Sequence, residues 1–269
     1  MAVARVRTGM KSFRSFLSAH LPAALVRRLK RLYYPWVLSR FPEANWPFSP
    51  LVQRLVHPGD CVVDAGANIG YVTLLLSRRV GASGCVHSFE PVPETFEWLS
   101  ESVRKLGLPN VSLHNCGLSD SARDATMGIP RYSTGGENLY ESRIVEEGRG
   151  ARFARTVGVS LNTLDAALAD GRRVSFIKID VEGHELRAVK GAVGVISRDK
   201  PALLIEVTGD PDQGGSAACE LFALLSGLGY RAFTWEEGKL QPRSPGCRSG
   251  DYVFLLAAHL ASVEFVPAA

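Results

Sequence analysis

Short apolar segments alternate with amphipathic ones between residues 61 and 257, and this alternation limits the fold of the chain more than any other feature. The segments expected to be strands are 61–65, 85–90, 111–115, 174–180, 202–207, 230–235 and 251–257. Helices are expected at 71–81, 93–107, 161–171, after 184 and at 215–227. Strands joined by crossover helices run parallel, so the pattern predicts an α/β fold with a doubly wound, mainly parallel sheet. No helix separates the last two strands, which are therefore expected to pair antiparallel at one edge.

The first 47 residues differ in charge from the rest. Nine cations and no acidic residue lie before position 41: Arg5, Arg7, Lys11, Arg14, Arg27, Arg28, Lys30, Arg31 and Arg40. The whole chain has a net charge of +4, so the remainder is mildly acidic and the pI does not indicate nucleic-acid binding. We expect a basic amphipathic extension over 1–47, divided into two helices by Pro22, and a single domain over 48–269.

This extension allows two roles. Its apolar residues follow a loosely helical pattern, which usually means that helices pack on the main domain or on a partner subunit. A basic amphipathic segment with aromatic residues can also lie on an anionic membrane surface. Peripheral membrane contact is therefore kept as an alternative to packing.

Cysteine usage and hydropathy indicate the compartment. The five cysteines are scattered, without a Cys-x-x-Cys pair or the paired histidines of a zinc site, so we expect reduced, mostly buried thiols and no metal. The sequence has neither an apolar run of about 18 residues nor the pattern of a secretory signal. A cytoplasmic protein is expected.

Residues 120–158 interrupt the alternation. The segment is too polar for a core and longer than an ordinary loop, so we expect a small hairpin insertion over the ligand site. Its Tyr132, Asn138, Tyr140 and Arg143 would suit a hydroxylated ligand, although such residues are equally at home on any solvated lid.

The stretch CVVDAGANIG places a carboxylate and a glycine-rich turn directly after the first strand. In doubly wound sheets, ligands bind beyond the carboxyl ends of the strands, where Asp64, Gly66, Asn68 and Gly70 are expected. The glycines allow close approach of the backbone, and the N–H groups of the following helix suit a carboxylate or phosphate. The turn lacks the Gly-x-Gly-x-x-Gly spacing of dinucleotide-binding proteins, which weakens the hypothesis of an NAD-dependent oxidoreductase.

Acidic residues recur at the ends of later strands. Glu90 ends the second strand, where a carboxylate can accept hydrogen bonds from both hydroxyls of a ribose, or can simply be solvated. Asp180, Glu182, His184 and Glu206 are expected to converge on the same crevice. A carboxylate and an imidazole there could remove a proton or hold a metal. His184 could equally be a helix-start residue bonded to backbone.

Several segments resemble the FkbM-type methyltransferases, a branch of the class I S-adenosylmethionine-dependent enzymes. They are VVDAGANIG, SFEPVPETF, VSLNTLD, FIKIDVEGHELRAVKGA, PALLIEV and SGDYVFL, spanning roughly residues 60–257. The resemblance implies a Rossmann-like seven-stranded sheet, S-adenosylmethionine as cofactor, and methyl transfer to a hydroxyl of a sugar, glycoconjugate or secondary metabolite. A small-molecule or glycan acceptor is therefore the expected partner, and nucleic acid is not.

The resemblance also implies roles for individual residues. Asp64, Gly66, Asn68 and Gly70 would shape the methionine end of the cofactor site, Glu90 would bind the ribose, and Asn115 and Cys116 would border the adenine. Asp180, His184 and Glu206 would face the acceptor. His184 is the first choice of general base, with Asp180 orienting it or sharing that role, and a divalent metal is conceivable there but not predicted. The alternatives are a catalytically silent cofactor-binding or membrane-associated scaffold protein and, with less support, an NAD-dependent oxidoreductase.

Overall fold

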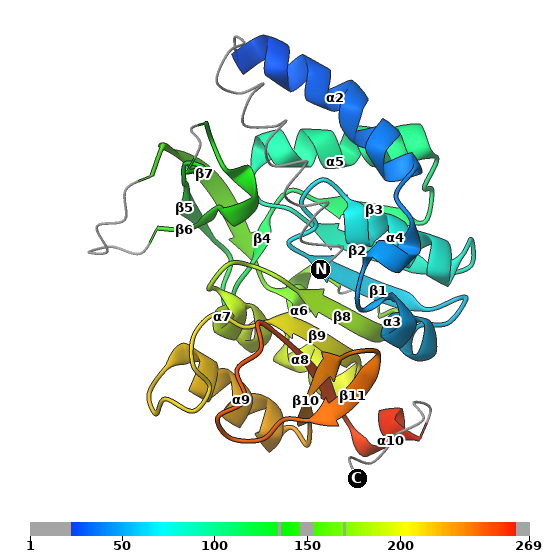
Figure 1. Ribbon diagram of the computed structural model, residues 1–269, viewed down its shortest axis with the longest axis vertical. Coiled ribbons are helices and arrows are strands. Elements are labelled where there is room, and N and C mark those ends of the chain that lie inside the picture. The colour runs from blue at the N-terminus through cyan, green and yellow to red at the C-terminus, as the bar shows by residue number, and fades with distance from the viewer. Residues whose placement is uncertain (1–22, 134–135, 146–152, 169–170, 262–269) are drawn as a thin grey trace.

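The computed structural model describes residues 23–133, 136–145, 153–168 and 171–261. Its main sheet has eight strands in the order β11-β10-β12-β9-β8-β1-β2-β3 (Figure 1). Their bounds are β1 Cys61–Ala65, β2 Cys85–Phe89, β3 Val111–His114, β8 Val174–Ile179, β9 Ala202–Glu206, β10 Arg231–Glu236, β11 Lys239–Pro242 and β12 Asp251–Leu255. Strands β3, β2, β1, β8 and β9 are parallel, which confirms the Rossmann-like doubly wound sheet.

The sheet has one strand more than the seven expected. β10 turns back into β11 through Glu237 and Gly238, which both have positive φ, and a two-residue turn of this kind suits a hairpin. The predicted antiparallel pairing of the last two long strands is confirmed between β10 and β12. However, β12 lies inside the sheet, between β9 and β10, and β11 forms the edge.

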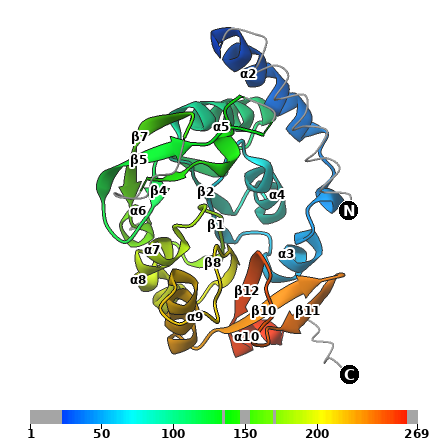
Figure 2. The same ribbon diagram turned by 60° about the vertical axis from the view of Figure 1, so that its left-hand side comes forward.

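Alternating side chains of the strands fill two cores on opposite faces of the sheet. Val62 packs with α3 (Ser49–Leu55) and α4 (Tyr71–Val80) on one face. Val63 packs on the other face with α6 (Leu164–Ala167), α7 (Glu185–Lys190), α8 (Val193–Asp199) and α9 (Ala217–Gly227), and Figure 2 shows these helices on their two sides of the sheet. A short helix, α10 (Ala257–Leu260), follows β12.

Helix boundaries follow the proline and glycine signals of the sequence. α5 (Pro93–Leu106) has its proline at the first turn and ends at Gly107, which is left-handed at φ 63°. The helix expected over 161–171 is much shorter, because residues 161–162 finish strand β7. Thr163 then caps α6, since its side chain accepts a hydrogen bond from the N–H of Ala166.

The insertion is larger than a hairpin. It forms a second sheet in the order β4-β7-β5-β6, with β4 Gly117–Leu118, β5 Arg123–Ile129, β6 Arg143–Ile144 and β7 Arg155–Asn162. The long antiparallel pairing of β5 with β7 is the predicted hairpin, and β4 and β6 extend it on either side. A 3₁₀ turn, η2 (Leu139–Glu141), lies between β5 and β6.

Helix α2 (Ala23–Ser39) is part of the folded unit. It lies along α5 and buries Val26, Tyr34 and Leu38, and the Tyr34 hydroxyl accepts a hydrogen bond from the Tyr140 hydroxyl of the insertion. This agrees with packing of the extension on the main domain. The helix expected before Pro22 lies outside the described residues. After α2, a 3₁₀ turn, η1 (Glu43–Asn45), leads to α3.

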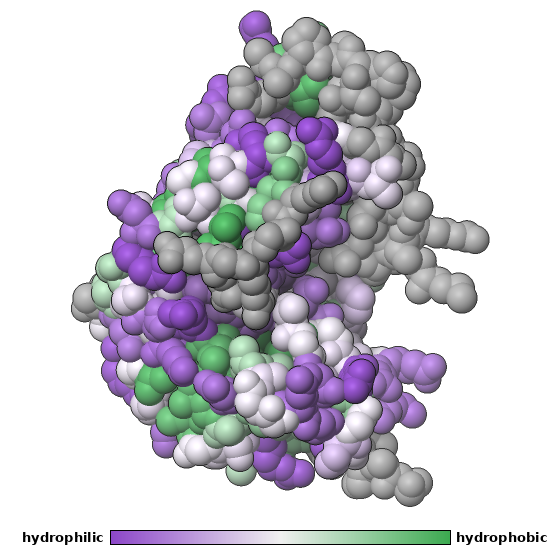
Figure 3. All heavy atoms as spheres, turned by 90° about the vertical axis from the view of Figure 1, so that its left-hand side faces the viewer, coloured by the Kyte–Doolittle hydropathy of each residue, from purple (hydrophilic) through white to green (hydrophobic). Residues whose placement is uncertain are grey.

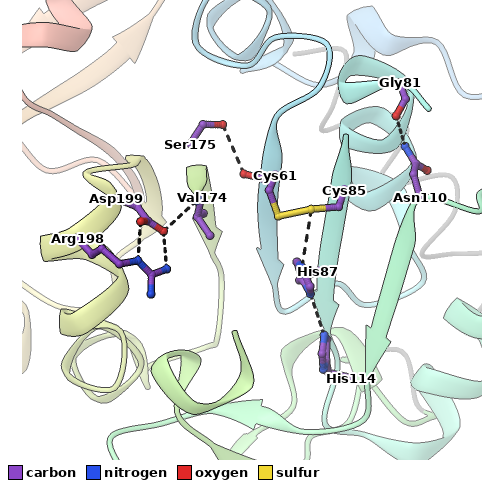
Figure 4. The surroundings of a disulfide bond; sticks show 10 residues. All are labelled: Cys61, Gly81, Cys85, His87, Asn110, His114, Val174, Ser175, Arg198 and Asp199. Atoms are coloured by element: carbon purple, nitrogen blue, oxygen red, sulfur yellow. Dashed lines mark hydrogen bonds and ion pairs between the residues drawn. A yellow bond between two sulfur atoms is a disulfide. The ribbon is translucent and has the colours of Figure 1, made fainter. Parts of the chain in front are cut away.

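The prediction that all cysteines are reduced is wrong for two of them. Cys61 and Cys85 form a disulfide between β1 and β2, with their Cα atoms 4.5 Å apart (Figure 4). They are paired because they begin neighbouring parallel strands in direct register, and register cannot be read from cysteine spacing. Cys116, Cys219 and Cys247 are free thiols and half-buried.

Candidate active site

A cavity of 610 Å³ lies at the carboxyl ends of the central strands. This volume is within the usual range for a small-molecule site. Its lining comes from the ends of β1, β2, β8 and β9, from the second sheet, and from the segment between α2 and α3. Phe41, Asn45, Trp46 and Pro47 line it, so the domain boundary predicted at residue 47 passes through the cavity wall.

A buried carboxylate–ammonium network supports the floor of this cavity. Asp64 is completely buried, accepts a hydrogen bond of 2.6 Å from Thr73, and has its other oxygen 3.7 Å from Lys178 Nζ. Lys178 Nζ also donates to Asp180 at 3.1 Å. Burial disfavours the charged ammonium, but Asp180 and Asp64 outweigh it and raise the pKa of Lys178, whereas burial raises the pKa of Asp64. Asp64 is thus a supporting residue behind the cavity rather than part of its lining.

Gly66 lets two strand ends approach each other closely. Its φ is 79°, and a Cβ atom at this position would collide with the backbone carbonyl oxygen of Asp180. The glycine is therefore required by the contact between the β1 turn and the end of β8. It still lines the cavity, as does Asn68, whereas Gly70 precedes α4 in a left-handed conformation.

Glu90 is buried at the end of β2 and faces the cavity. One carboxylate oxygen accepts the N–H of Asn68 at 3.0 Å and the other accepts the N–H of Val92 at 2.9 Å. Burial raises the pKa of Glu90 to about 7. The two backbone bonds hold the side chain in place, and each oxygen keeps a second lone pair that can accept a ligand hydroxyl.

The residues expected around an adenine lie beside the cavity. Asn115 donates to the carbonyl oxygen of Glu90 at 2.9 Å, so it positions the residue predicted to bind ribose. Cys116 packs against the core. The following Gly117 and Leu118 form the cavity wall instead.

The three residues predicted to face an acceptor, Asp180, His184 and Glu206, all line the cavity. Glu182, which the sequence places at the same crevice, lines it too, and so does Asp251, which no sequence signal indicates. Asp251 is paired in register with Glu206 across β12 and β9.

The pKa values of two of these carboxyls are raised into the neutral range. Burial, followed by the negative charges of Asp180 and Asp251, raises the pKa of Glu206 to about 8. Burial and the charge of Asp180 likewise raise the pKa of Glu182 to about 7. Carboxyls tuned to near-neutral pKa values in a cavity are typical of acid–base sites.

The turn after β8 positions the side chains of Glu182 and His184. Glu182 is left-handed at φ 52°, an uncommon conformation for this residue type, and is followed by Gly183 at φ 96°. The N–H of Gly183 donates to Glu185 at 2.6 Å, which fixes the turn. His184 is buried at the start of α7, and its Nε2 is hydrogen-bonded to the Ser119 hydroxyl at 3.0 Å.

The cavity lining is strongly acidic. Its carboxylates are Glu90, Glu141, Asp180, Glu182, Glu206 and Asp251, and within the described residues Lys178 supplies its one ammonium group. A ligand with positive charge near the strand ends is therefore favoured.

Lys178 is a cavity residue that was not expected from the sequence, although the sequence carries a signal for it. Lys178 interrupts an otherwise apolar strand, VSFIKI, and a lysine there requires an anionic partner. Asp251 has no such signal, because only the fold brings it to the cavity. Of the four insertion residues that the sequence indicates, Tyr132, Asn138 and Tyr140 line the cavity, and Arg143 is not among the lining residues.

These residues fit S-adenosylmethionine. Glu90 is placed at the end of β2 to accept ribose hydroxyls, and the acidic lining suits a sulfonium and an ammonium group. Neither the turn after β1 nor the lining provides the phosphate-cradling glycine loop of a dinucleotide site.

The fold and this site define a class I S-adenosylmethionine-dependent methyltransferase domain. Residues 64–232 match the model of the methyltransferase FkbM domain, so the chain belongs to the FkbM family. This confirms the resemblance found in the sequence, and the family implies S-adenosylmethionine as cofactor.

The chain spans only about half to three fifths of the length of the curated relatives that it matches. The methyltransferase sdnD of Sordaria araneosa is 32% identical over 172 residues, 55% of this chain and 62% of the relative. The hexuronic acid methyltransferase AglP of Haloferax volcanii is 27% identical over 139 residues, 51% of this chain and 52% of the relative. The chain also aligns with a crystal structure of the methyltransferase FkbM from Methylobacillus flagellatus. The alignment covers 86% of this chain and 60% of that chain, at 17% sequence identity and a TM-score of 0.46.

Proposed function

We propose that this protein transfers the methyl group of S-adenosylmethionine to a hydroxyl of an uncharged or amino-bearing sugar, or of a similarly hydroxylated metabolite. The observation that carries the proposal is a single cavity with Glu90 at the end of β2 and a group of carboxyls at the ends of β8 and β9. A cofactor held at Glu90 would have its reactive end toward those carboxyls. The name of AglP supports a sugar acceptor, and so do polar residues of the insertion, Tyr132 and Asn138 among them, which line the same cavity.

The acidic lining argues against a hexuronic acid as the acceptor of this chain. Even with Glu206 protonated, the described lining holds more carboxylates than ammonium groups, and the ammonium of Lys178 is already bonded to Asp180. A carboxylate on the acceptor would be repelled without a cation to compensate for its desolvation. Neutral or cationic acceptors avoid this cost.

Bound S-adenosylmethionine would supply an electrophilic methyl carbon, and the residues of this chain would position an alcohol and accept its proton. The protein contributes mainly proximity, alignment and exclusion of water. We propose Glu182 as the general base, because a carboxyl with a pKa of about 7 is substantially ionised at neutral pH and still basic. Glu206, with a pKa of about 8, would keep its proton and donate a hydrogen bond to the acceptor.

His184 was the first choice of base from the sequence. Its contact with Ser119 favours a positioning role, in which the imidazole holds the turn that carries Glu182. The two assignments predict that different variants lose turnover.

A methyl-transfer screen tests the proposed reaction. Radiolabelled S-adenosylmethionine is offered with three acceptors that differ at one position: a neutral hexoside, the corresponding amino sugar and the corresponding hexuronic acid. We expect transfer to the first two and little to the third. Binding of S-adenosylhomocysteine without transfer to any member of a wider acceptor panel would favour the scaffold alternative. Membership of the FkbM family leaves the NAD-dependent alternative without support.

Substitution of Glu90 by glutamine is expected to weaken binding of S-adenosylhomocysteine by roughly ten- to a hundredfold. The reason is the loss of a charge-assisted hydrogen bond, which contributes about 1.5–3 kcal/mol. Isothermal titration calorimetry measures the affinity. Glu97→Gln is the matched control, because Glu97 pairs with Arg31 on the surface, outside the cavity lining. Equal affinities of both variants would refute the ribose assignment.

We also propose that α2 rests on an anionic membrane surface. The large hydrophobic residues that are exposed in the described structure are Leu25, Leu29, Leu32 and Trp36, and all lie on α2. Their spacing of four, three and four residues places them on one stripe of the helix, opposite the face that packs on α5. The face shown in Figure 3, on the side of the second sheet and α7, is mixed, with hydrophobic patches among hydrophilic residues.

Charge complementarity supports a membrane as the occupant of this stripe. The exposed Arg28 and Arg40 flank it by their helical spacing, and Arg40 lies 4.5 Å from the ring centre of Trp36. No helix of the described residues is long and apolar enough to cross a membrane. Contact would therefore be peripheral.

Leu32→Asp is expected to reduce partitioning of the full chain onto phosphatidylserine-containing vesicles by roughly tenfold or more, because burial of a leucine side chain contributes about 1.5–3 kcal/mol. Co-sedimentation measures the bound fraction. Ala82→Asp, which adds the same charge at another exposed position, is the control and should bind like wild type. Equal binding of wild type and Leu32→Asp would exclude this surface.

A further inference from the structure

Two cysteines and a histidine come together at the amino ends of β1 and β2, away from the methyl-transfer cavity (Figure 4). Cys61 and Cys85 start the two strands, and His87 follows two residues along β2 on the same face. All three side chains are buried. We propose that reduced Cys61 and Cys85, together with His87, form a binding site for Zn²⁺, and that the disulfide and the bound metal are alternative states of this site.

The geometry of the cluster suits a tetrahedral ion. One donor atom from each of the three residues lies within 4.8 Å of the other two, and Cys85 Sγ is 3.9 Å from His87 Nε2. With Zn–S bonds of about 2.3 Å and Zn–N bonds of about 2.0 Å, tetrahedral coordination places sulfur and nitrogen about 3.6 Å apart and two sulfurs about 3.8 Å apart. Once the disulfide is reduced, a modest separation of the two sulfurs brings all three donors to these distances.

A second histidine orients the first. His87 Nδ1 lies 3.2 Å from His114 Nε2, and the His114 ring is stacked on Phe89 with centroids 4.3 Å apart. When His87 Nδ1 donates its proton to His114, the lone pair of Nε2 faces the sulfurs. Zinc-ligating histidines typically have such a partner on their other ring nitrogen.

The cluster also has an entry path. A second cleft, of 510 Å³, is lined by Cys61, and its other polar lining residues include the cations Arg172, Arg173 and Lys200, the carboxylate of Asp60, and His57 and His259. Positive charge favours the thiolate form of a nearby cysteine, which is the form that binds metal. Thiolate and imidazole ligands select zinc over magnesium or calcium. The cleft beside Cys61 is where a water could reach the fourth position of the ion.

A phosphine or dithiol reductant supplies two electrons and, with two protons, converts the disulfide into two thiols. Zn²⁺ then displaces those two protons and is neutralised by the two thiolates. The proposal does not depend on the proposed function, because Asp64 and Glu90 lie at the opposite ends of the same strands.

The test uses the full chain, reduced with a phosphine under anaerobic conditions and titrated with Zn²⁺ against a chromophoric chelator. We expect one equivalent of tightly bound zinc for the reduced wild type and none at this site for the oxidised protein. Co²⁺ in place of zinc should show thiolate-to-cobalt charge-transfer absorption. His114→Ala should weaken zinc binding by roughly ten- to a hundredfold, as expected for loss of a residue that orients a ligand.

Two cysteine variants decide the assignment. Cys85→Ser should lose both the tight zinc site and the cobalt–thiolate absorption, whereas Cys219→Ser, which alters a free cysteine on α9, should bind like wild type. Circular dichroism checks that each variant is folded. The proposal is overturned if the reduced wild type binds zinc no more tightly than Cys85→Ser, or if its cobalt spectrum lacks the thiolate band.

Discussion

Replacement of Lys178 by methionine is expected to lower the free energy of unfolding by about 3–5 kcal/mol, because removal of one partner leaves a buried charge without compensation. Lys178 Nζ lies 3.7 Å from Asp64 and 3.1 Å from Asp180, and the Asp64 side chain has no exposure to solvent. Chemical denaturation of the full chain measures the loss.

Two further variants identify the cause of that loss. The double substitution Lys178→Met and Asp64→Asn should recover part of the stability, because the remaining buried group is then neutral. Lys190→Met is the matched control, since Lys190 forms an exposed pair with Glu220, and its effect should be within about 0.5 kcal/mol. A loss below about 1 kcal/mol for Lys178→Met would show that the network does not support the fold.

Glu182→Gln is expected to lower the turnover of methyl transfer by about 10²–10⁴-fold while leaving the affinity for S-adenosylhomocysteine nearly unchanged, as expected for loss of a general base. A base must be deprotonated to act. The wild-type rate should therefore rise with pH through about 7, where Glu182 loses its proton, and fall again above about 8, where Glu206 loses the proton that it donates. The variant should lack that rise.

The control for Glu182→Gln is a substitution at a glutamate with the same unusual backbone conformation. Glu237 is also left-handed, at φ 50°, but lies in the β10–β11 turn, so Glu237→Gln should behave as wild type. His184→Ala separates the two candidate bases. If it abolishes turnover while Glu182→Gln retains wild-type turnover and pH dependence, His184 is the base, as first expected from the sequence.

The sequence predicts an element correctly where the residues that determine its structure lie within that element. The run CVVDA predicted strand β1, and Pro93 with Gly107 bounded α5, because backbone restriction and apolar patterning act within a few residues. The convergence of Asp180, His184 and Glu206 was predictable because parallel strands share one carboxyl edge.

Contacts between distant segments were not predictable in this way. β11, the full second sheet and the lining role of Trp46 depend on pairing and packing partners elsewhere in the chain. The disulfide is the clearest case. Cys61 and Cys85 are 24 residues apart, and only the register of β1 on β2 places them opposite each other.

The sequence by itself determined the order of strands and helices, the family, and the chemical types of the residues at the strand ends. Those properties reside in local patterns of polarity and in short motifs. The tertiary structure alone decided that Asp64 supports the cavity from behind through Lys178, that Asp251 joins the cavity lining, and that two cysteines and a histidine form a separate cluster. These outcomes depend on burial and on distances between segments far apart in the chain, which also set the pKa values on which the proposed chemistry rests.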